Sequence, residues 1–253
     1  MSEPATLEQE ELCTLWEFPD WMEEEVLAAV VEERPDNAPE YGPRGMVAPG
    51  NLWNNGRTIE VGFVNDHPDI HDPVVQDALR RFFSEWTQFA NLTLKFTGVG
   101  GGGQIRISLK GPGMHSLAGA SALATHTAPT VSLERVRAGV DPAAYDLGVR
   151  HEAGHAVIGF GHEHQHPNRA FKLDRAKTLA HFKRVSGWSA EMTERQVLST
   201  RPPSSVKLHP YDMQSVLHYM IPAEIRSDGG PAIVHGRTLS AKNKEAAAFY
   251  YPR

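Results

Sequence analysis

The sequence predicts an α+β fold, because stretches with strand periodicity and stretches with helix periodicity both occur in one chain of 253 residues. Residues 57–64 (RTIEVGFV), 92–99 and 104–110 are rich in β-branched side chains and predict strands, the first at an edge or half-buried position. Helices are predicted for residues 146–160, for 174 to about 185, and for 73–90, where six apolar side chains lie at helical spacing: Val75, Leu79, Phe82, Phe83, Trp86 and Phe89.

The composition is that of an ordinary globular protein, with 40% hydrophobic and 22% charged residues. No apolar run approaches the ~20 residues that a membrane-spanning helix needs, so no membrane partner is expected. Cys13 is the only cysteine, which excludes an intramolecular disulfide and a thiolate-rich zinc site. Any metal site is therefore expected to use nitrogen and oxygen ligands.

Charge is unevenly distributed along the chain. Residues 1–40 contain thirteen of the 31 acidic residues and one of the 25 basic residues, Arg34, so the remainder has 18 acidic and 24 basic residues. Because these basic residues form no stripe with interleaved aromatic residues, no nucleic-acid partner is expected. The amino terminus lacks the basic and apolar regions of a secretory signal peptide. The location stays open between the cytoplasm and release by a non-classical route.

The sequence pattern changes near residue 50. An acidic, partly apolar segment precedes a Pro/Gly-rich stretch at residues 33–50, which is typical of a linker. We expect residues 1–49 to form an amino-terminal arm with its linker and residues 50–253 to form one catalytic domain. If the arm is an inhibitory pro-segment, Cys13 and Asp20 are the candidate metal-capping groups. The alternative is an extra helix packed on the domain, with Cys13 buried.

Residues 151–167, HEAGHAVIGFGHEHQHP, contain closely spaced histidines and a glutamate of the kind that bind a metal ion and transfer protons. On a helix, His151 and His155 lie one turn apart, about 6 Å along the axis, so both imidazoles project toward one point. Glu152 lies about 100° further around the helix, where its carboxylate does not bind the metal but reaches a water bound to it. The spacing therefore predicts a metal site with an adjacent base.

A third ligand must come from beyond this helix, since catalytic zinc typically has three protein ligands and one open position. Gly159 and Gly161 can end the helix and turn the chain back, because glycine adopts positive φ at little cost. His162 follows at the position where a third ligand is needed. His164 is a rival for that role.

The segment resembles the elongated zinc motif of the metzincins, and its GFGHEHQ portion resembles the astacin family and its bacterial relatives. Residues 211–219 (YDMQSVLHY) are similar to the astacin Met-turn segment, and residues 239–252 to the closing helix of bacterial astacin-like peptidases. The resemblance covers about residues 50–253. It implies a zincin fold, with a twisted, mostly parallel sheet and two long helices in an upper subdomain and an irregular lower subdomain.

Carried over by position, the resemblance implies one zinc ion per chain, bound by His151, His155 and His162. Glu152 would be the general base, and Tyr219 would bind the metal and later stabilise the transition state. Two positions depart from the family pattern. Residues 156–158 separate the second histidine from the glycine, where the family usually has two residues, so an extra helical residue or a wider turn is needed. Leu217 replaces the methionine of the Met-turn and is expected to keep the apolar floor under the metal.

These roles predict a zinc metalloendopeptidase, a hydrolase that acts on protein or peptide substrates. Zinc lowers the pKa of its bound water toward 7, and Glu152 accepts the proton as this water attacks the scissile carbonyl. The arm would act as an intramolecular inhibitor, as in a zymogen. Two alternatives remain open, namely a catalytically impaired metzincin-like zinc-binding module and a zinc hydrolase of a non-peptide amide.

Overall fold

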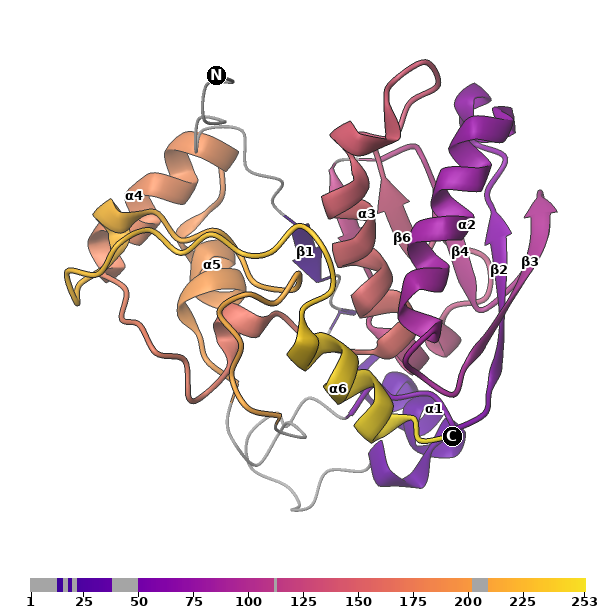
Figure 1. Cartoon of the computed structure of the whole chain (residues 1–253), viewed down its shortest axis with the longest axis horizontal. Helices are drawn as coiled ribbons and strands as arrows, with labels where there is room; N and C mark the ends of the chain where they lie inside the picture. Colours follow the sequence, from indigo (N-terminus) through magenta and orange to yellow (C-terminus); the bar gives the residue numbers. More distant parts are fainter. Residues whose placement is uncertain (1–12, 16–17, 20–21, 38–49, 112, 202–208) are drawn as a thin grey trace.

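A computed structural model describes residues 13–15, 18–19, 22–37, 50–111, 113–201 and 209–253. The candidate cap Asp20 and most of the predicted linker, residues 38–49, lie outside the described residues. Figure 1 shows a half with the sheet and helices α2 and α3, and a second half with α4, α5 and long irregular segments. Within the described residues, no helix is both long and apolar enough to span a membrane.

One six-stranded sheet has the strand order β1-β5-β6-β4-β2-β3. Neighbouring strands are parallel except for β5 and β6, which confirms the predicted mostly parallel sheet. The predicted edge position of β2 is wrong, since this strand lies between β3 and β4 and buries Ile59, Val61 and Phe63. The strands are β1 (Cys13–Leu15), β2 (Thr58–Phe63), β3 (Thr93–Val99), β4 (Ile105–Ser108), β5 (Met114–Ser116) and β6 (Val131–Leu133).

The helices begin at residues that cap them. Asp72 accepts hydrogen bonds from two backbone N–H groups of the first turn of α2, Asp174 caps α4, and Ser240 with Asn243 forms a capping box on α6. The three expected helices and the closing helix are all present. The α-helices are α1 (Glu23–Glu33), α2 (Pro73–Thr87), α3 (Asp146–Ala153), α4 (Arg175–Ser186), α5 (Ala190–Thr193) and α6 (Ala241–Tyr250).

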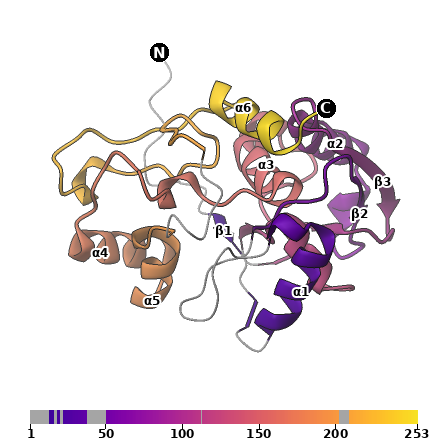
Figure 2. The same cartoon turned by 90° about the horizontal axis from the view of Figure 1, so that it is seen from below.

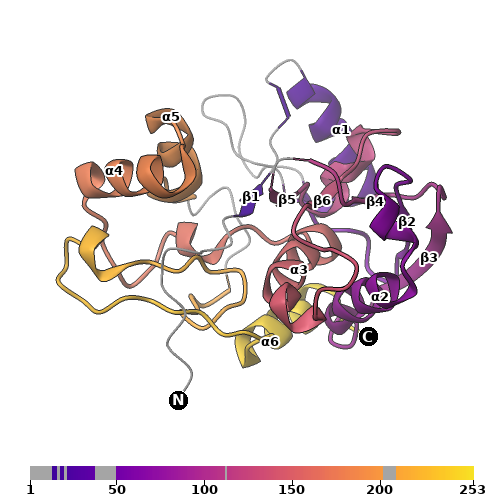
Figure 3. The ribbon, with the colours of Figure 1, turned by 90° about the horizontal axis from the view of Figure 1, so that it is seen from above.

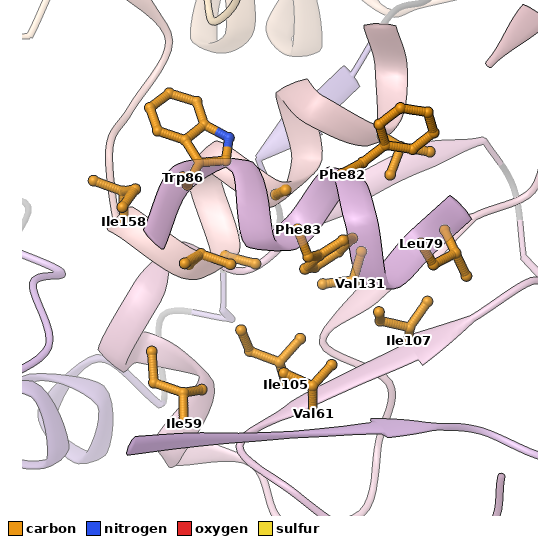
Figure 4. Packing of buried hydrophobic residues seen from close by; sticks show 14 of the residues in the cluster. Ile59, Val61, Leu79, Phe82, Phe83, Trp86, Ile105, Ile107, Val131 and Ile158 are labelled. Atoms are coloured by element: carbon orange, nitrogen blue, oxygen red, sulfur yellow. The ribbon is translucent and has the colours of Figure 1, made fainter. Parts of the chain in front are cut away.

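The main core lies between α2 and the sheet (Figure 4). The apolar face of α2 that the sequence predicts covers the central strands, and each fully buried side chain of this size contributes roughly 1.5–3 kcal/mol. This packing fixes α2 on the sheet and provides a wall for α3. The buried side chains are Leu79, Phe82, Phe83 and Trp86 of α2 with Ile59, Val61, Ile105, Ile107 and Val131 of the strands.

The amino-terminal segment contacts the rest of the protein at two places. Strand β1 adds to the free edge of β5 in a parallel register that pairs Cys13 with Met114 and Leu15 with Ser116. Helix α1 packs against the 3₁₀ helix Gly119–Ala124, and Figures 2 and 3 show α1 and α2 on opposite sides of the sheet. In all three views β1 lies between the two halves of the molecule.

Buried hydrogen bonds fasten the end of α1 to the start of the body. The Asn37 side chain donates to the carbonyls of Val30 and Leu52, at 2.9 and 2.7 Å, and accepts from the Leu52 N–H at 3.2 Å. The Arg34 guanidinium donates to the carbonyls of Trp53 and Tyr250. Residues on both sides of position 50 therefore share one hydrogen-bonded network.

We expect Asn37→Ala to lower the free energy of unfolding by about 2–4 kcal/mol, because it leaves buried backbone groups without partners. Urea denaturation followed by circular dichroism measures the change. The adjacent Asp36→Ala variant is the matched control, since Asp36 is exposed and its ion pair with Arg34, at 3.7 Å, is worth about 1 kcal/mol or less. Equal stabilities for the two variants would contradict an anchoring role of Asn37.

Candidate metal centre

The helix of the histidine motif changes geometry partway along. Asp146–Ala153 is α-helical, and Gly154–Ile158 then forms a π-helical turn. A π turn contains one more residue than an α turn and is typically found at functional sites. This wider turn accommodates the residue by which the motif exceeds the family pattern.

A π turn disturbs the regular hydrogen bonding of the helix, so its carbonyl groups need other donors. Trp53 Nε1–H donates to the Ala156 carbonyl at 3.2 Å, and the Tyr251 hydroxyl donates to the Ile158 carbonyl at 2.8 Å. The Trp53 N–H in turn donates to the Tyr251 hydroxyl oxygen at 3.0 Å. Two aromatic residues from opposite ends of the body thus stabilise the irregular helix end.

Gly159 ends the helix in the left-handed region, with φ of 81°. A Cβ at this position would lie 2.2 Å from the Asn51 carbonyl oxygen, so glycine is required both by backbone conformation and by space. The chain then returns, and the His155 Nδ1 lies 2.6 Å from the Phe160 carbonyl oxygen. The expected role of Gly159 in breaking the helix is confirmed.

The three histidines converge. Ring centroids are 4.7 Å apart for His151 and His155, 4.5 Å for His155 and His162, and 5.3 Å for His151 and His162. His151 Nδ1 lies 2.8 Å from the Val216 carbonyl, and His155 Nδ1 is held by Phe160, so both rings turn Nε2 inward. Such hydrogen bonds are typical of metal-binding histidines, because they set tautomer and ring orientation.

Four ring nitrogens of these histidines are buried and have no hydrogen-bond partner among the described residues: His151 Nε2, His155 Nε2 and both ring nitrogens of His162. Burial lowers the pKa of all three imidazoles, to about 4 for His155, so the rings stay neutral and keep a lone pair for a cation. Buried polar atoms without partners are costly. A metal ion would satisfy one nitrogen of each ring, so these residues fit such a group.

Cys13 joins this histidine cluster. One ligand atom from each of Cys13, His151, His155 and His162 lies within 4.8 Å of the others, and all four residues are buried. Burial, with the negative charge of Glu152, raises the pKa of the Cys13 thiol. A bound cation would reverse this effect, because it deprotonates a coordinating thiol. The expectation that only nitrogen and oxygen atoms surround the metal position is therefore wrong for this structure.

Glu152 is fully buried beside the cluster and is not one of its members. Its Oε2 accepts a hydrogen bond from the Ser116 hydroxyl at 2.7 Å. Sequence reasoning missed Ser116, because strand β5 is only three residues long and 36 positions separate Ser116 from Glu152. The pairing exists only once the sheet has formed.

Tyr219 and Leu217 bring the predicted Met-turn segment to the cluster. The Tyr219 ring lies 4.7 Å from the His162 ring, and its hydroxyl donates to the Cys13 carbonyl oxygen. Leu217 is buried under the helix, where a Cβ on Gly154 would lie 2.7 Å from a Leu217 methyl group. Leu217 therefore packs against the helix of the histidine motif, and its role as an apolar floor under a metal stays a prediction.

His164 does not belong to the cluster in the described part of the chain. Its Nε2 lies 2.8 Å from the Gln196 carbonyl, and its ring stacks on Tyr219 with centroids 4.1 Å apart. Glu163 accepts a hydrogen bond from the Asp212 N–H, and burial raises its pKa to about 7. Both residues hold the segment that carries Tyr219.

Comparison with solved structures finds proteins of similar fold. A structure of myroilysin matches with a TM-score of 0.73 at 29% identity, covering 80% of this chain and 96% of that chain. A crystal structure of myroilysin matches with a TM-score of 0.58 at 27% identity, covering 95% and 100%. High choriolytic enzyme 1 (HCE-1), a hatching enzyme zinc-protease from the medaka fish Oryzias latipes, gives 0.52 at 13% identity, covering 84% and 100%.

The likeness to the hatching enzyme HCE-1, at 13% identity, shows the fold alone. No family model matches the chain, and no curated protein matches it. The structural neighbours confirm the predicted α+β fold and the resemblance to astacin-like metzincins. Fold and site together define the class of the protein as a metallopeptidase, a hydrolase, and the histidine cluster is compatible with zinc.

We expect stability to fall between pH 6.5 and 4. Burial lowers the pKa of His218 to about 4, so in this window the unfolded chain binds a proton that the native state does not. The free energy of unfolding should drop by roughly 3 kcal/mol from this group as the pH falls. Urea denaturation of chelator-treated protein at several pH values measures it. His218→Asn should flatten the dependence and the exposed His71→Asn should not; equal slopes would contradict this account.

Proposed function

We propose that the protein is a zinc-dependent endopeptidase in which His151, His155 and His162 hold one zinc ion. The observation that carries the proposal is the convergence of buried imidazole nitrogens that have no partner in the part of the chain that the structure describes. Three neutral histidines are a common ligand set of catalytic zinc and leave a position for water or substrate. When bound, zinc supplies a Lewis acid that lowers the pKa of water and polarises the scissile carbonyl.

The chain's own residues supply the proton transfer. Glu152 lies against the cluster without belonging to it, so its carboxylate accepts a proton from the attacking water and returns it to the leaving amine. The Tyr219 phenol faces the same space, and burial raises its pKa. It therefore stays protonated and donates a hydrogen bond to the negative charge that develops on the carbonyl oxygen.

We further propose that the amino-terminal segment inhibits the enzyme through Cys13. Its thiol lies with the three histidines, which is the position that water needs. Its carbonyl accepts the hydrogen bond of the Tyr219 hydroxyl. Cys13 therefore engages both the histidine cluster, through its thiol, and the Tyr219 phenol, through its carbonyl. Strand β1 holds Cys13 there by pairing with β5. These contacts favour Cys13 as the cap over an extra helix that merely buries it.

In a Cys13→Ser background, which removes the proposed cap, Glu152→Gln should lower casein hydrolysis by about 10²–10⁴-fold while one zinc per chain is retained, because general acid–base catalysis contributes a factor of this size. Casein turnover and metal content by mass spectrometry measure the two properties. Ser121→Ala, which changes a buried serine that is not a member of the cluster and donates to the Ala118 carbonyl, is the control. Full activity in a zinc-loaded Glu152→Gln protein would refute the proposed base. Zinc without casein cleavage in any variant would favour a binding module or a hydrolase of non-peptide amides.

Cys13→Ser in the full chain should raise the casein activity at least about tenfold over wild type, since a neutral hydroxyl is a far weaker zinc ligand than a thiolate. The initial rate of freshly purified zinc-loaded protein is the measurement. Thr14→Ser alters the next residue of β1 and should leave the rate of the wild type unchanged. A Cys13→Ser rate equal to that of wild type would sink the inhibitory role of this residue.

A further inference from the structure

The hydrogen bond between Ser116 and Glu152 joins two fully buried side chains. A buried carboxylate is strongly destabilised unless hydrogen bonds compensate its lost hydration. The Ser116 hydroxyl has a single hydrogen to donate, and at 2.7 Å this hydrogen goes to Glu152 Oε2. Hydrogen bonds to an ionised group are about twice as strong as neutral ones, so this contact restrains rotation of the carboxylate.

The sheet, rather than a loop, determines where Ser116 lies. Strand β5 is held by antiparallel pairing with β6, which places Ser116 opposite Val131. Side chains alternate along a strand, so Ser116 and Met114 face α3 while His115 faces away. The hydroxyl is therefore positioned by the same strand whose other edge pairs with β1.

We propose that Ser116 is a positioning residue that orients the Glu152 carboxylate for proton transfer. The inference rests on the proposed function, in which Glu152 is the general base. The Ser116 hydrogen bond to Oε2 sets the orientation in which the carboxylate meets the attacking water. Rotation of the carboxylate would move its proton-accepting oxygen away from this water and slow the chemical step, whereas substrate binding would be unaffected. Loss of the hydroxyl therefore lowers kcat and leaves KM unchanged.

The experiment uses the full zinc-loaded chain with Cys13→Ser, which frees the site. Ser116→Ala is compared with Ser121→Ala, whose hydroxyl donates to the Ala118 carbonyl and does not touch Glu152. We expect kcat on a quenched fluorescent peptide to fall about 10- to 100-fold, the range for groups that orient a metal-site residue, with KM within about twofold and zinc content unchanged. Ser121→Ala retains both constants.

A double-variant cycle separates positioning from general destabilisation. In a Glu152→Gln background, Ser116→Ala should cause no further loss of kcat, because two residues that act as one unit are not additive. A loss of the same factor in both backgrounds overturns the proposal, and so does an unchanged kcat in Ser116→Ala. Loss of zinc, or a melting temperature well below that of Ser121→Ala, assigns a structural role instead and also overturns it.

A crystal structure of Ser116→Ala gives a readout that does not depend on activity. The Glu152 carboxylate should leave the orientation that it has beside Ser116, and an unmoved carboxylate overturns the proposal. If the zinc-loaded Cys13→Ser protein cleaves no peptide, the proposed function fails. The positioning of Glu152 by Ser116 is then decided by this structure alone.

Discussion

The short turn between His155 and His162 is the constraint on which the rest of the site depends. Two of the clustered histidines come from one helix, and His162 must return to them within a few residues. The π-helical turn and Gly159 make this return, at the cost of irregular backbone hydrogen bonding. Trp53 and Tyr251 compensate by donating to carbonyls of the turn. The histidine cluster is therefore supported by contacts between the beginning and the end of the body, 198 residues apart.

Burial favours the uncharged form of the imidazoles and of the phenol at the site. It lowers the pKa of each imidazole and raises that of Tyr219, so the histidines keep their lone pairs and the phenol keeps its proton. Backbone carbonyls then orient two of the rings, and Ser116 contacts the carboxylate of Glu152. A cation entering this cluster would meet neutral ligands that are already directed toward it. Little rearrangement is needed, which is the physical meaning of a preorganised site.

The amino-terminal segment combines two kinds of contact. Strand β1 uses main-chain pairing with an edge strand, which any extended peptide can form. The residues after α1 use specific hydrogen bonds to the start of the body, partly buried for Arg34 and buried for Asn37. In the proposed mechanism these contacts have different consequences, because the first lies over the metal position and the second supports Trp53, which stabilises the π turn. Residues before position 50 would thus both block the site and stabilise it.

The sequence by itself determined the parts that depend on local periodicity and spacing. These are helix α2 with its apolar face, the helix of the histidine motif, the glycine break and the three convergent histidines. Strands β1, β5 and β6 escaped prediction, because three residues are too few to show alternation. Only the tertiary structure brought Cys13 to the histidines and Ser116 to Glu152, and only it accommodated the extra motif residue in a π turn. These features depend on contacts between residues far apart in the chain, and a local sequence pattern contains no information about such contacts.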